Sequence, residues 1–313
     1  MITLSDVQAA RARLGANIRR TPMLKADNLS APITDAALHL KLELLQATGS
    51  FKARGATNRL LATPKEELAH GIVTASGGNH GVAVARTGKL AGVPAHVFVP
   101  KNISPPKLEK LKRWGAEVQL VGDVFDEADK AARAYAKEIG AVYFHPFADP
   151  LVVAGQGTVA LEILEDLPEV DTFLIAIGGG GLVGGMGTAI RALKPKARII
   201  GIEPVGCPTL KASIDAGHVV TIDKITTIVP TMSCARTDER VFELVRSVVD
   251  DIVLVDDAAM IDAARWLWFE MGLAADLSGA AALAALKGGL VPVAPGETVC
   301  ALVCGAGPEG IAA

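Results

Sequence analysis

The chain has 313 residues, half of them hydrophobic and only 4% aromatic, and it contains 32 glycines. This length allows one large or two medium domains, and the composition suits an α/β enzyme with parallel sheets and tight turns. The net charge is -3 with both signs mixed along the sequence, which excludes the basic field that a nucleic-acid partner requires.

Segments typical of strands and helices alternate along almost the whole chain. Residues 1–15 predict an amphipathic helix with Ser5 as its N-cap, and they lack the apolar core of a signal peptide, so we expect a cytoplasmic protein. The alternation favours a doubly wound α/β fold, with twisted, mostly parallel sheets flanked by helices. The predicted strands are 38–44, 71–75, 95–99, 117–121, 172–177, 199–203, 252–255 and 298–303.

Three consecutive β-α units of similar length predict a small domain in the first half of the chain. We expect residues 70–148 to form this small α/β domain, and 1–69 together with 149–313 to form a larger one. A ligand would lie in the cleft between the two domains, at the carboxyl ends of strands.

Neither a membrane partner nor a disulfide framework is expected. The longest apolar stretch, 173–190, is interrupted by glycines and could not span a bilayer as a stable helix. The cysteines are few for a chain of this length and none forms a C-x-x-C pair, so a zinc or redox motif is also not predicted. They are Cys207, Cys234, Cys300 and Cys304.

The segment 48–56 places Lys52 between a predicted strand and a helix. A lysine at a helix start is usually a solvated surface residue. Here it is flanked by Phe51 and small residues, where strand ends meet the expected cleft. A desolvated lysine has a lowered pKa and becomes an amine nucleophile toward a carbonyl group.

The segment 76–81, Ser-Gly-Gly-Asn-His-Gly, also joins a strand to a helix. Backbone N–H groups at such a turn bind an anion, here a carboxylate. The alternative is a plain glycine-rich turn with Asn79 as a helix cap. His80 is equally compatible with a cap or a core histidine, and we assign it no acid–base role.

The segment 178–185 begins with four glycines after a predicted strand, and consecutive glycine N–H groups at a helix start suit a phosphate. A second interpretation is a nicotinamide dinucleotide site. Gly179, Gly181 and Gly184 satisfy G-x-G-x-x-G, and Glu203 follows nineteen residues beyond Gly184 as a possible ribose ligand. Within this segment the two interpretations are equally good.

The last predicted strand ends in Cys304, which taken alone indicates a buried cysteine. In order and spacing, however, the four segments together resemble fold-type II pyridoxal-phosphate (PLP) enzymes, whose fold is tryptophan synthase β-like. More narrowly, the chain resembles the serine/threonine dehydratase and serine racemase group, from about Ile18 to the C-terminus. PLP is therefore the expected cofactor, bound mainly by the larger domain.

The resemblance also implies roles for individual residues. Lys52 would hold PLP as a Schiff base and remove the substrate Cα proton. Phe51 would pack on the cofactor ring, Asn79 would hydrogen-bond its 3′-oxygen, and Cys304 would face the pyridine nitrogen. The phosphate would be bound by Gly178, Gly179, Gly180, Gly181 and Leu182. The substrate carboxylate would be bound by Ser76, Gly78, Asn79 and His80.

The implied reaction is β-elimination from a small β-hydroxy amino acid such as L-threonine or L-serine, giving a 2-oxo acid and ammonia, in a homodimer. Racemases of the group carry a serine where this chain has Gly77, so racemisation ranks below elimination. Beta-replacement is another alternative. Asp276 and Arg236 depart from the usual pattern and favour a larger or acidic substrate, such as phenylserine or hydroxyaspartate, unless Arg236 is simply exposed.

The group's divalent-cation site begins with a glutamate at the position of Glu203. Thr209 stands where the second ligand, an aspartate, is expected. Glu203 is thus either a metal ligand or a solvated strand end.

Overall fold

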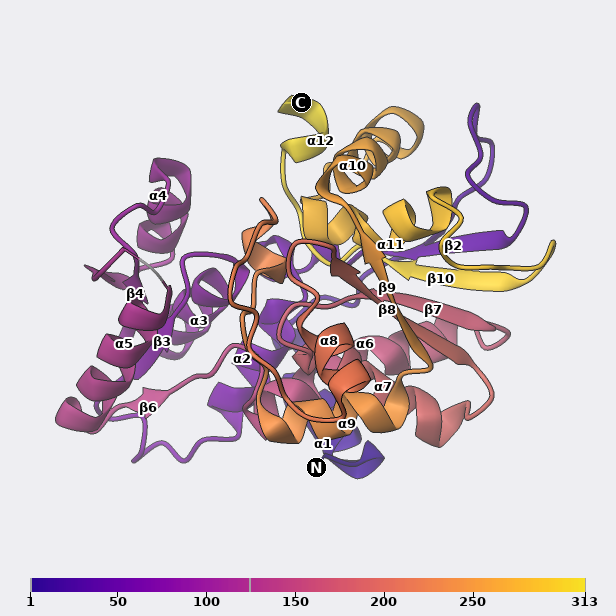
Figure 1. Cartoon of the computed structure of the whole chain (residues 1–313). Helices are drawn as coiled ribbons and strands as arrows, with labels where there is room; N and C mark the ends of the chain where they lie inside the picture. Colours follow the sequence, from indigo (N-terminus) through magenta and orange to yellow (C-terminus); the bar gives the residue numbers. More distant parts are fainter. Residues whose placement is uncertain (1, 124, 313) are drawn as a thin grey trace.

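The computed structural model describes residues 2–123 and 125–312, in which helices surround two β sheets (Figure 1). The first sheet has six strands, all parallel except the antiparallel pair β1–β2 at one edge. In spatial order its strands are β1 (Met23–Lys25), β2 (Ala37–Lys41), β10 (Thr298–Leu302), β7 (Thr172–Ala176), β8 (Arg198–Pro204) and β9 (Asp251–Val255).

The second sheet has four parallel strands and uses only the part of the chain between Ile72 and Tyr143. Its central strands are apolar and fully buried, as expected for parallel strands covered on both faces. In spatial order the strands are β5 (Glu117–Leu120), β4 (Ala95–Val99), β3 (Ile72–Ala75) and β6 (Val142–Tyr143).

Helices cover both faces of each sheet. On the six-stranded sheet, α1, α2, α6, α7 and α9 pack together on one side, and α10 and α11 lie on the other (Figure 1). The α-helices are α1 (Leu4–Leu14), α2 (Lys52–Leu61), α3 (Asn79–Ala91), α4 (Pro105–Arg113), α5 (Phe125–Ile139), α6 (Pro150–Asp166), α7 (Gly181–Leu193), α8 (Thr209–Ala216), α9 (Glu239–Val248), α10 (Asp257–Met271), α11 (Leu277–Lys287) and α12 (Glu309–Ala312). The 3₁₀ turns are η1 (Gly15–Asn17), η2 (Glu43–Leu45), η3 (Ala47–Gly49) and η4 (Pro230–Met232).

Helix α2 connects the two sheets. Its apolar residues Ala56 and Leu60 join a core cluster with Ile72 of β3 and with residues of α3. Its other side packs on α6, where a Cβ added at Gly155 would lie 2.7 Å from the Gly55 Cα. Only glycines permit this approach, so the sequence around Lys52 fixes α2 between the two halves of the molecule.

The eight predicted strands are all present, with ends that shift by a few residues. The predicted strand 38–44 ends at Lys41 because η2 begins at Glu43. The N-cap of α1 was predicted wrongly: it is Thr3, whose side chain accepts from the Asp6 N–H while Asp6 accepts from the Thr3 N–H. The short strands β1 and β6 were not predicted.

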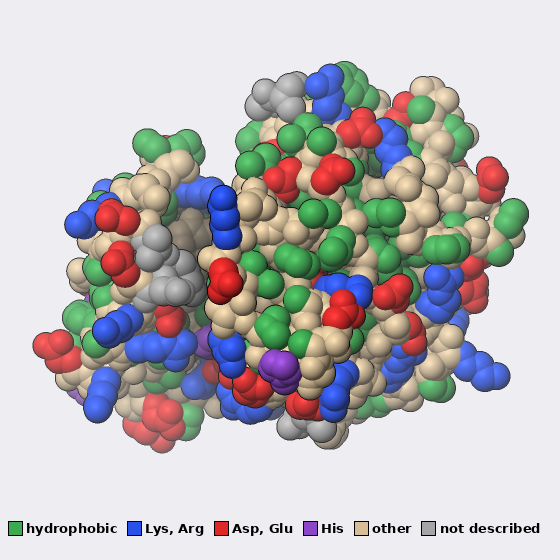
Figure 2. All heavy atoms as spheres, in the orientation of Figure 1, with side chains coloured by type: hydrophobic (Ala, Val, Ile, Leu, Met, Phe, Trp, Pro, Cys, Tyr) green, Lys and Arg blue, Asp and Glu red, His purple; other side chains and the backbone are tan. Residues whose placement is uncertain are grey.

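Charged side chains of both signs are interspersed over the face drawn in Figure 2, with hydrophobic side chains gathered between them over the larger part. In the part of the chain that the structure describes, no helix combines the length and apolar character needed to cross a membrane. The apolar stretch 173–190 forms β7 and most of α7, packed inside the molecule.

Candidate active site

Lys52 is the first residue of α2, and a sharp reversal of the chain places it there. Thr48 and Gly49 have φ angles of 65° and 84°, a region that a β-branched residue such as threonine rarely adopts. The reversal is fixed to the end of β10, because Ala306 N–H donates to Gly49 O at 2.8 Å and Phe51 N–H donates to Cys304 O at 3.2 Å. Such strain is characteristic of functional sites.

The Lys52 side chain is half-buried beside the Phe51 ring. Its Nζ donates to Pro146 O at 2.7 Å and lies 5.2 Å from the centre of the Phe51 ring. Burial lowers the pKa of Lys52 to about 8, because the charged ammonium loses its hydration. A much larger fraction of this amine is therefore neutral, and nucleophilic, near neutral pH than of an ordinary lysine.

Four buried charges lie directly beneath the start of α2; we call Lys41, Glu43, Arg54 and Glu162 the buried charge cluster. Arg54 donates to Glu43 at 2.6 Å and to Glu162 at 2.7 Å, and Lys41 Nζ donates to Glu162 at 2.7 Å. Both cations and Glu43 are fully buried. Because each charge has opposite partners, their desolvation is compensated, and the cluster ties α2 to β2, η2 and α6.

The tetraglycine turn leads into α7 and exposes a row of unused donors. Within the described residues, nothing accepts from the backbone N–H groups of Gly178, Gly179, Gly180, Gly181 or Leu182. Gly180 has a φ of 92°, and Thr237 Oγ1 donates to Gly179 O at 3.0 Å, which holds the turn in place. Donors at the positive end of a helix suit an anion with several oxygens, such as a phosphate.

The turn before α3 offers a second set of donors. Gly78 N–H donates to Ser76 Oγ at 3.3 Å, whereas the N–H groups of Asn79, His80 and Gly81 have no acceptor among the described residues. The His80 ring is buried, with Nε2 3.2 Å from Phe144 O. Burial lowers its pKa to about 3, so the ring is neutral and is bound as a structural group.

Two segments bring polar side chains to the end of β10. Asn79 Nδ2 donates to Asp276 at 3.1 Å, and Cys304 Sγ donates to Ser278 Oγ at 3.7 Å. Burial raises the pKa of the Cys304 thiol well above its usual range, and the nearby Asp276 adds to this effect. Cys304 is therefore a neutral thiol. It lies close to Lys52, whose positive charge acts in the opposite direction and lowers the pKa of the thiol.

Glu203 is not the solvated strand end that the sequence allowed, and its role as a metal ligand stays a prediction. It is buried, and its carboxylate oxygens accept the backbone N–H groups of Leu210 and Lys211 at 2.9 and 2.8 Å, at the start of α8. The described part of the chain contains no group of three His, Cys, Asp or Glu side chains able to hold a metal ion. Both Glu203 oxygens thus bind the backbone at the start of α8.

Arg236 lies outside the site. It is exposed and donates to Thr221 and Glu239, which matches the simpler of the two sequence interpretations. The sequence did not indicate that Phe147 forms a wall of the tetraglycine turn, where a Cβ at Gly179 would lie 2.3 Å from its ring. Phe147 ends a His-Pro-Phe segment, residues 145–147, in which no pattern predicts this contact.

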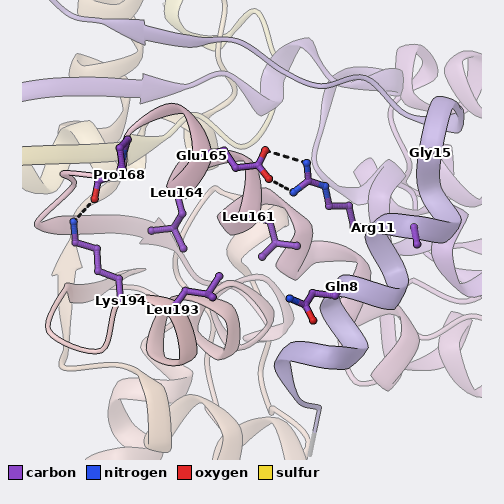
Figure 3. Close-up of a pocket in the computed structure, with 10 residues that line it drawn as sticks. Gln8, Arg11, Gly15, Leu161, Leu164, Glu165, Pro168, Leu193 and Lys194 are labelled. Carbon is purple, nitrogen blue, oxygen red and sulfur yellow. Dashed lines mark hydrogen bonds and ion pairs between the residues drawn. The ribbon is translucent and has the colours of Figure 1, made fainter.

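A surface cavity of about 820 Å³ lies away from these residues, between α1, α6 and the end of α7 (Figure 3). Arg11 and Glu165 pair across it, and Lys194 donates to Pro168 O at its edge. None of its lining residues belongs to the lysine segment or to either glycine-rich turn. The charged side chains Arg11 and Glu165 neutralise each other, and we assign no catalytic role to this cavity.

The residues around Lys52 fit PLP. An aldehyde requires a neutral amine, which Lys52 supplies, and a phosphate requires several N–H donors, which the turn at 178–182 leaves free. Asn79 and Cys304 offer a hydrogen-bonding amide and a neutral thiol for the polar atoms of a pyridine ring. No residue of this set requires a nicotinamide dinucleotide.

The comparisons with known proteins agree with this fit. The model for the family described as pyridoxal-phosphate dependent enzyme matches residues 15–305. The L-threonine ammonia-lyase of Geobacter sulfurreducens is 40% identical over 96% of this chain and 75% of its own. The phenylserine dehydratase of Ralstonia pickettii is 36% identical over 96% and 92%.

A solved structure of maize serine racemase has the same fold, with a TM-score of 0.92 and 33% identity over 97% of this chain and 93% of the racemase. This confirms the expected tryptophan synthase β-like architecture of mostly parallel sheets flanked by helices. The chain belongs to the family of pyridoxal-phosphate dependent enzymes, so its cofactor is PLP.

Proposed function

We propose that this protein is a PLP-dependent ammonia-lyase that removes water from a small β-hydroxy amino acid. L-Threonine and L-serine are the substrates we propose first, each giving a 2-oxo acid and ammonia. The relatives that the chain resembles over nearly its whole length include L-threonine ammonia-lyases. The observation that carries the proposal is the Lys52 amine, whose pKa is lowered to about 8 by burial, in a chain with two turns whose N–H donors are unused.

The residues act by binding and by moving protons. When bound, the cofactor withdraws electrons from the substrate Cα and so makes its proton acidic. Lys52 Nζ would accept that proton. The N–H groups at 178–182 would hold the cofactor phosphate, and those of Asn79 and His80, with the Ser76–Gly78 turn, would hold the substrate carboxylate. Phe51 would support the ring face, and the neutral Cys304 would face its nitrogen without supplying a full charge.

Elimination is favoured over racemisation because of Gly77. Racemisation needs a proton donor on the face of Cα opposite Lys52, and we assign that side to the turn before α3. Glycine has no proton to give, and the buried His80 ring, held by Phe144 O and neutral, is not available as a substitute. The single base at Lys52 is sufficient for loss of a β-hydroxyl.

The substrate side chain is the least constrained part of the proposal. Arg236 is bound to neighbours on the surface, which weakens the case for an acidic substrate such as hydroxyaspartate. Phenylserine remains a second candidate because a phenylserine dehydratase is among the relatives. Beta-replacement is the alternative reaction with the same cofactor.

We further propose that residues 70–148 work as a small domain against 1–69 and 149–313, in a cytoplasmic homodimer. The separate four-stranded sheet supports the division. Free cysteines, three of them buried, suit a reducing compartment.

The adjacent Trp268 and Phe269 are 37% and 73% exposed, as expected for the interface of the proposed dimer. Light scattering on the wild type and on Phe269→Glu tests the dimer: the variant should be monomeric.

The test of the reaction uses purified enzyme loaded with PLP. Wild type should show a visible absorption band and release 2-oxo acid from L-threonine or L-serine without added nucleophile. Lys52→Ala should lose both, whereas Lys65→Ala, at an exposed lysine after the same helix, should keep both. Hydroxyaspartate and phenylserine isomers complete the panel, and each product is assayed for the D-isomer. A colourless wild type, or D-isomer without oxo acid, would refute the proposal.

A further inference from the structure

Asp276 is a buried carboxylate that joins two parts of the site. It is the N-cap of α11: its Oδ1 accepts from Gly279 N–H at 2.6 Å and from Ser278 Oγ at 2.7 Å. Its Oδ2 accepts from Asn79 Nδ2 at 3.1 Å. Asn79 begins α3, which packs on the other sheet. One side chain, 8% exposed, therefore connects the start of α11 with the turn before α3.

The bond to Asp276 determines how the Asn79 amide is turned. Burial raises the pKa of Asp276, but the three N–H and O–H groups that face its oxygens favour the ionised form. A carboxylate only accepts hydrogen bonds, so the amide nitrogen must face it. If the amide rotated by half a turn, its carbonyl oxygen would face the carboxylate, and two acceptors would be in contact. With the nitrogen held by one N–H, its second N–H is available to a neighbouring acceptor.

The same carboxylate sets the direction of a second chain of bonds. Ser278 donates its only O–H to Asp276, so toward Cys304 the Ser278 oxygen acts as an acceptor. The Cys304 thiol proton then points to Ser278. These bonds connect the start of α11 with the segment that follows β10.

We propose that Asp276 is a positioning residue of the cofactor site, acting through Asn79. It presents an Asn79 N–H to the ring oxygen of the cofactor. The inference rests on the role proposed above for Asn79. Asp276 itself need not touch the cofactor.

Asp276→Asn separates this role from capping. Asparagine caps helices as well as aspartate, but its amide nitrogen would face the Asn79 nitrogen and make that amide rotate. We expect the PLP dissociation constant, measured by fluorescence titration, to rise about tenfold. The visible band should lose intensity to a band at shorter wavelength, because the ring oxygen loses a donor that stabilises its anionic form.

The matched control is Asp256→Asn. Asp256 caps α10 in the same way, accepting from Ala259 N–H, and has no contact with the site. It should leave PLP affinity and the spectrum unchanged, and both variants should unfold near the wild-type temperature. Asp276→Glu keeps a carboxylate acceptor and should restore the band at longer wavelength.

A double variant tests whether Asp276 acts through Asn79. If it does, Asp276→Asn in an Asn79→Ala background should weaken PLP binding by less than it does alone. Three results would overturn the inference: wild-type spectrum and affinity in Asp276→Asn, the same losses in Asp276→Glu, or full additivity with Asn79→Ala. A wild type that binds no PLP would instead refute the proposed function.

Discussion

Two glycine-rich turns lead into two helices of this protein, and they differ in how much space surrounds them. The turn before α7 is enclosed: a Cβ at Gly179 would lie 2.3 Å from the Phe147 ring. The turn before α3 is open. A Cβ at Gly78 would meet nothing within 4 Å, and one at Gly77 would meet mainly the flexible end of Ile103, at 2.9 Å.

The difference shows how backbone donors can serve two kinds of ligand. An enclosed turn without side chains holds one shape, which suits a group that stays through many turnovers, such as the cofactor phosphate. An open turn carrying Ser76 and Asn79 suits a group that enters and leaves each time, such as a substrate carboxylate. Both turns offer helix-start N–H groups, so we attribute the different ligands proposed for them to their surroundings.

The largest expected effect is the pH dependence of PLP attachment. It distinguishes Lys52 from both turns, because the Lys52 amine titrates and backbone N–H groups do not. Burial lowers the pKa of Lys52 to about 8, so the neutral fraction rises about tenfold per pH unit below that value and levels above it. The rate at which apo-enzyme attaches PLP covalently should therefore increase about 50-fold from pH 6 to 8. Stopped-flow absorbance measures it; a flat profile over that range would contradict the prediction.

Gly179→Ala and Gly78→Ala should have opposite consequences. The first forces a methyl group into the Phe147 ring and should weaken PLP binding more than about tenfold, because overpacking costs about 1–3 kcal/mol. The second has room, so PLP affinity should stay within about twofold while KM for the amino acid changes. Fluorescence titration and steady-state kinetics distinguish the two. Equal effects on PLP affinity would mean that the turns are not functionally distinct.

Gly77→Ser uses the open space to add a hydroxyl on the face opposite Lys52. The Ile103 side chain can shift, so the variant should fold and retain most of its elimination activity. It should also release D-serine from L-serine, because an added acid–base group typically changes such rates by 10²–10⁴-fold. Chiral chromatography of the products measures this. If the variant folds and eliminates but forms no D-serine, the opposite face is not at Gly77.

The smallest effect is expected for Thr237→Val, which removes the hydrogen bond to Gly179 O. A bond of this kind contributes about 1 kcal/mol, so PLP affinity should fall about fivefold or less. Thr188→Val removes a similar bond, from Thr188 Oγ1 to Gly184 O at 2.8 Å within α7, and serves as the control. It should not change PLP affinity.

Sequence reasoning succeeded where a local pattern determines the outcome. The buried strand before the tetraglycine turn, the helix after it and the helix start at Lys52 all follow from short-range rules. It failed for β1 and β6, whose three and two residues are too short to show a period. The prediction of Ser5 as the first N-cap was also wrong. The cap is Thr3, two residues earlier, and only the backbone geometry distinguishes the two positions.

Contacts between distant residues were also beyond the sequence. Asp276 and Asn79 are 197 positions apart, and no periodicity relates them. Glu203 was correctly placed at a strand end, but its hydrogen bonds depend on where α8 begins, six residues later. The chemistry of a motif is thus readable from residue types, while the partner of each polar group depends on how the chain is packed.

The buried charge cluster beneath α2 has a consequence for how this sequence can change over time. Replacing any one of its four members strands a buried charge, at a cost of about 3–5 kcal/mol, a large share of a typical domain's stability. Exposed pairs such as Arg11 and Glu165 can be lost singly at little cost. The cluster beneath Lys52 can therefore change only by coordinated replacement of several of its members.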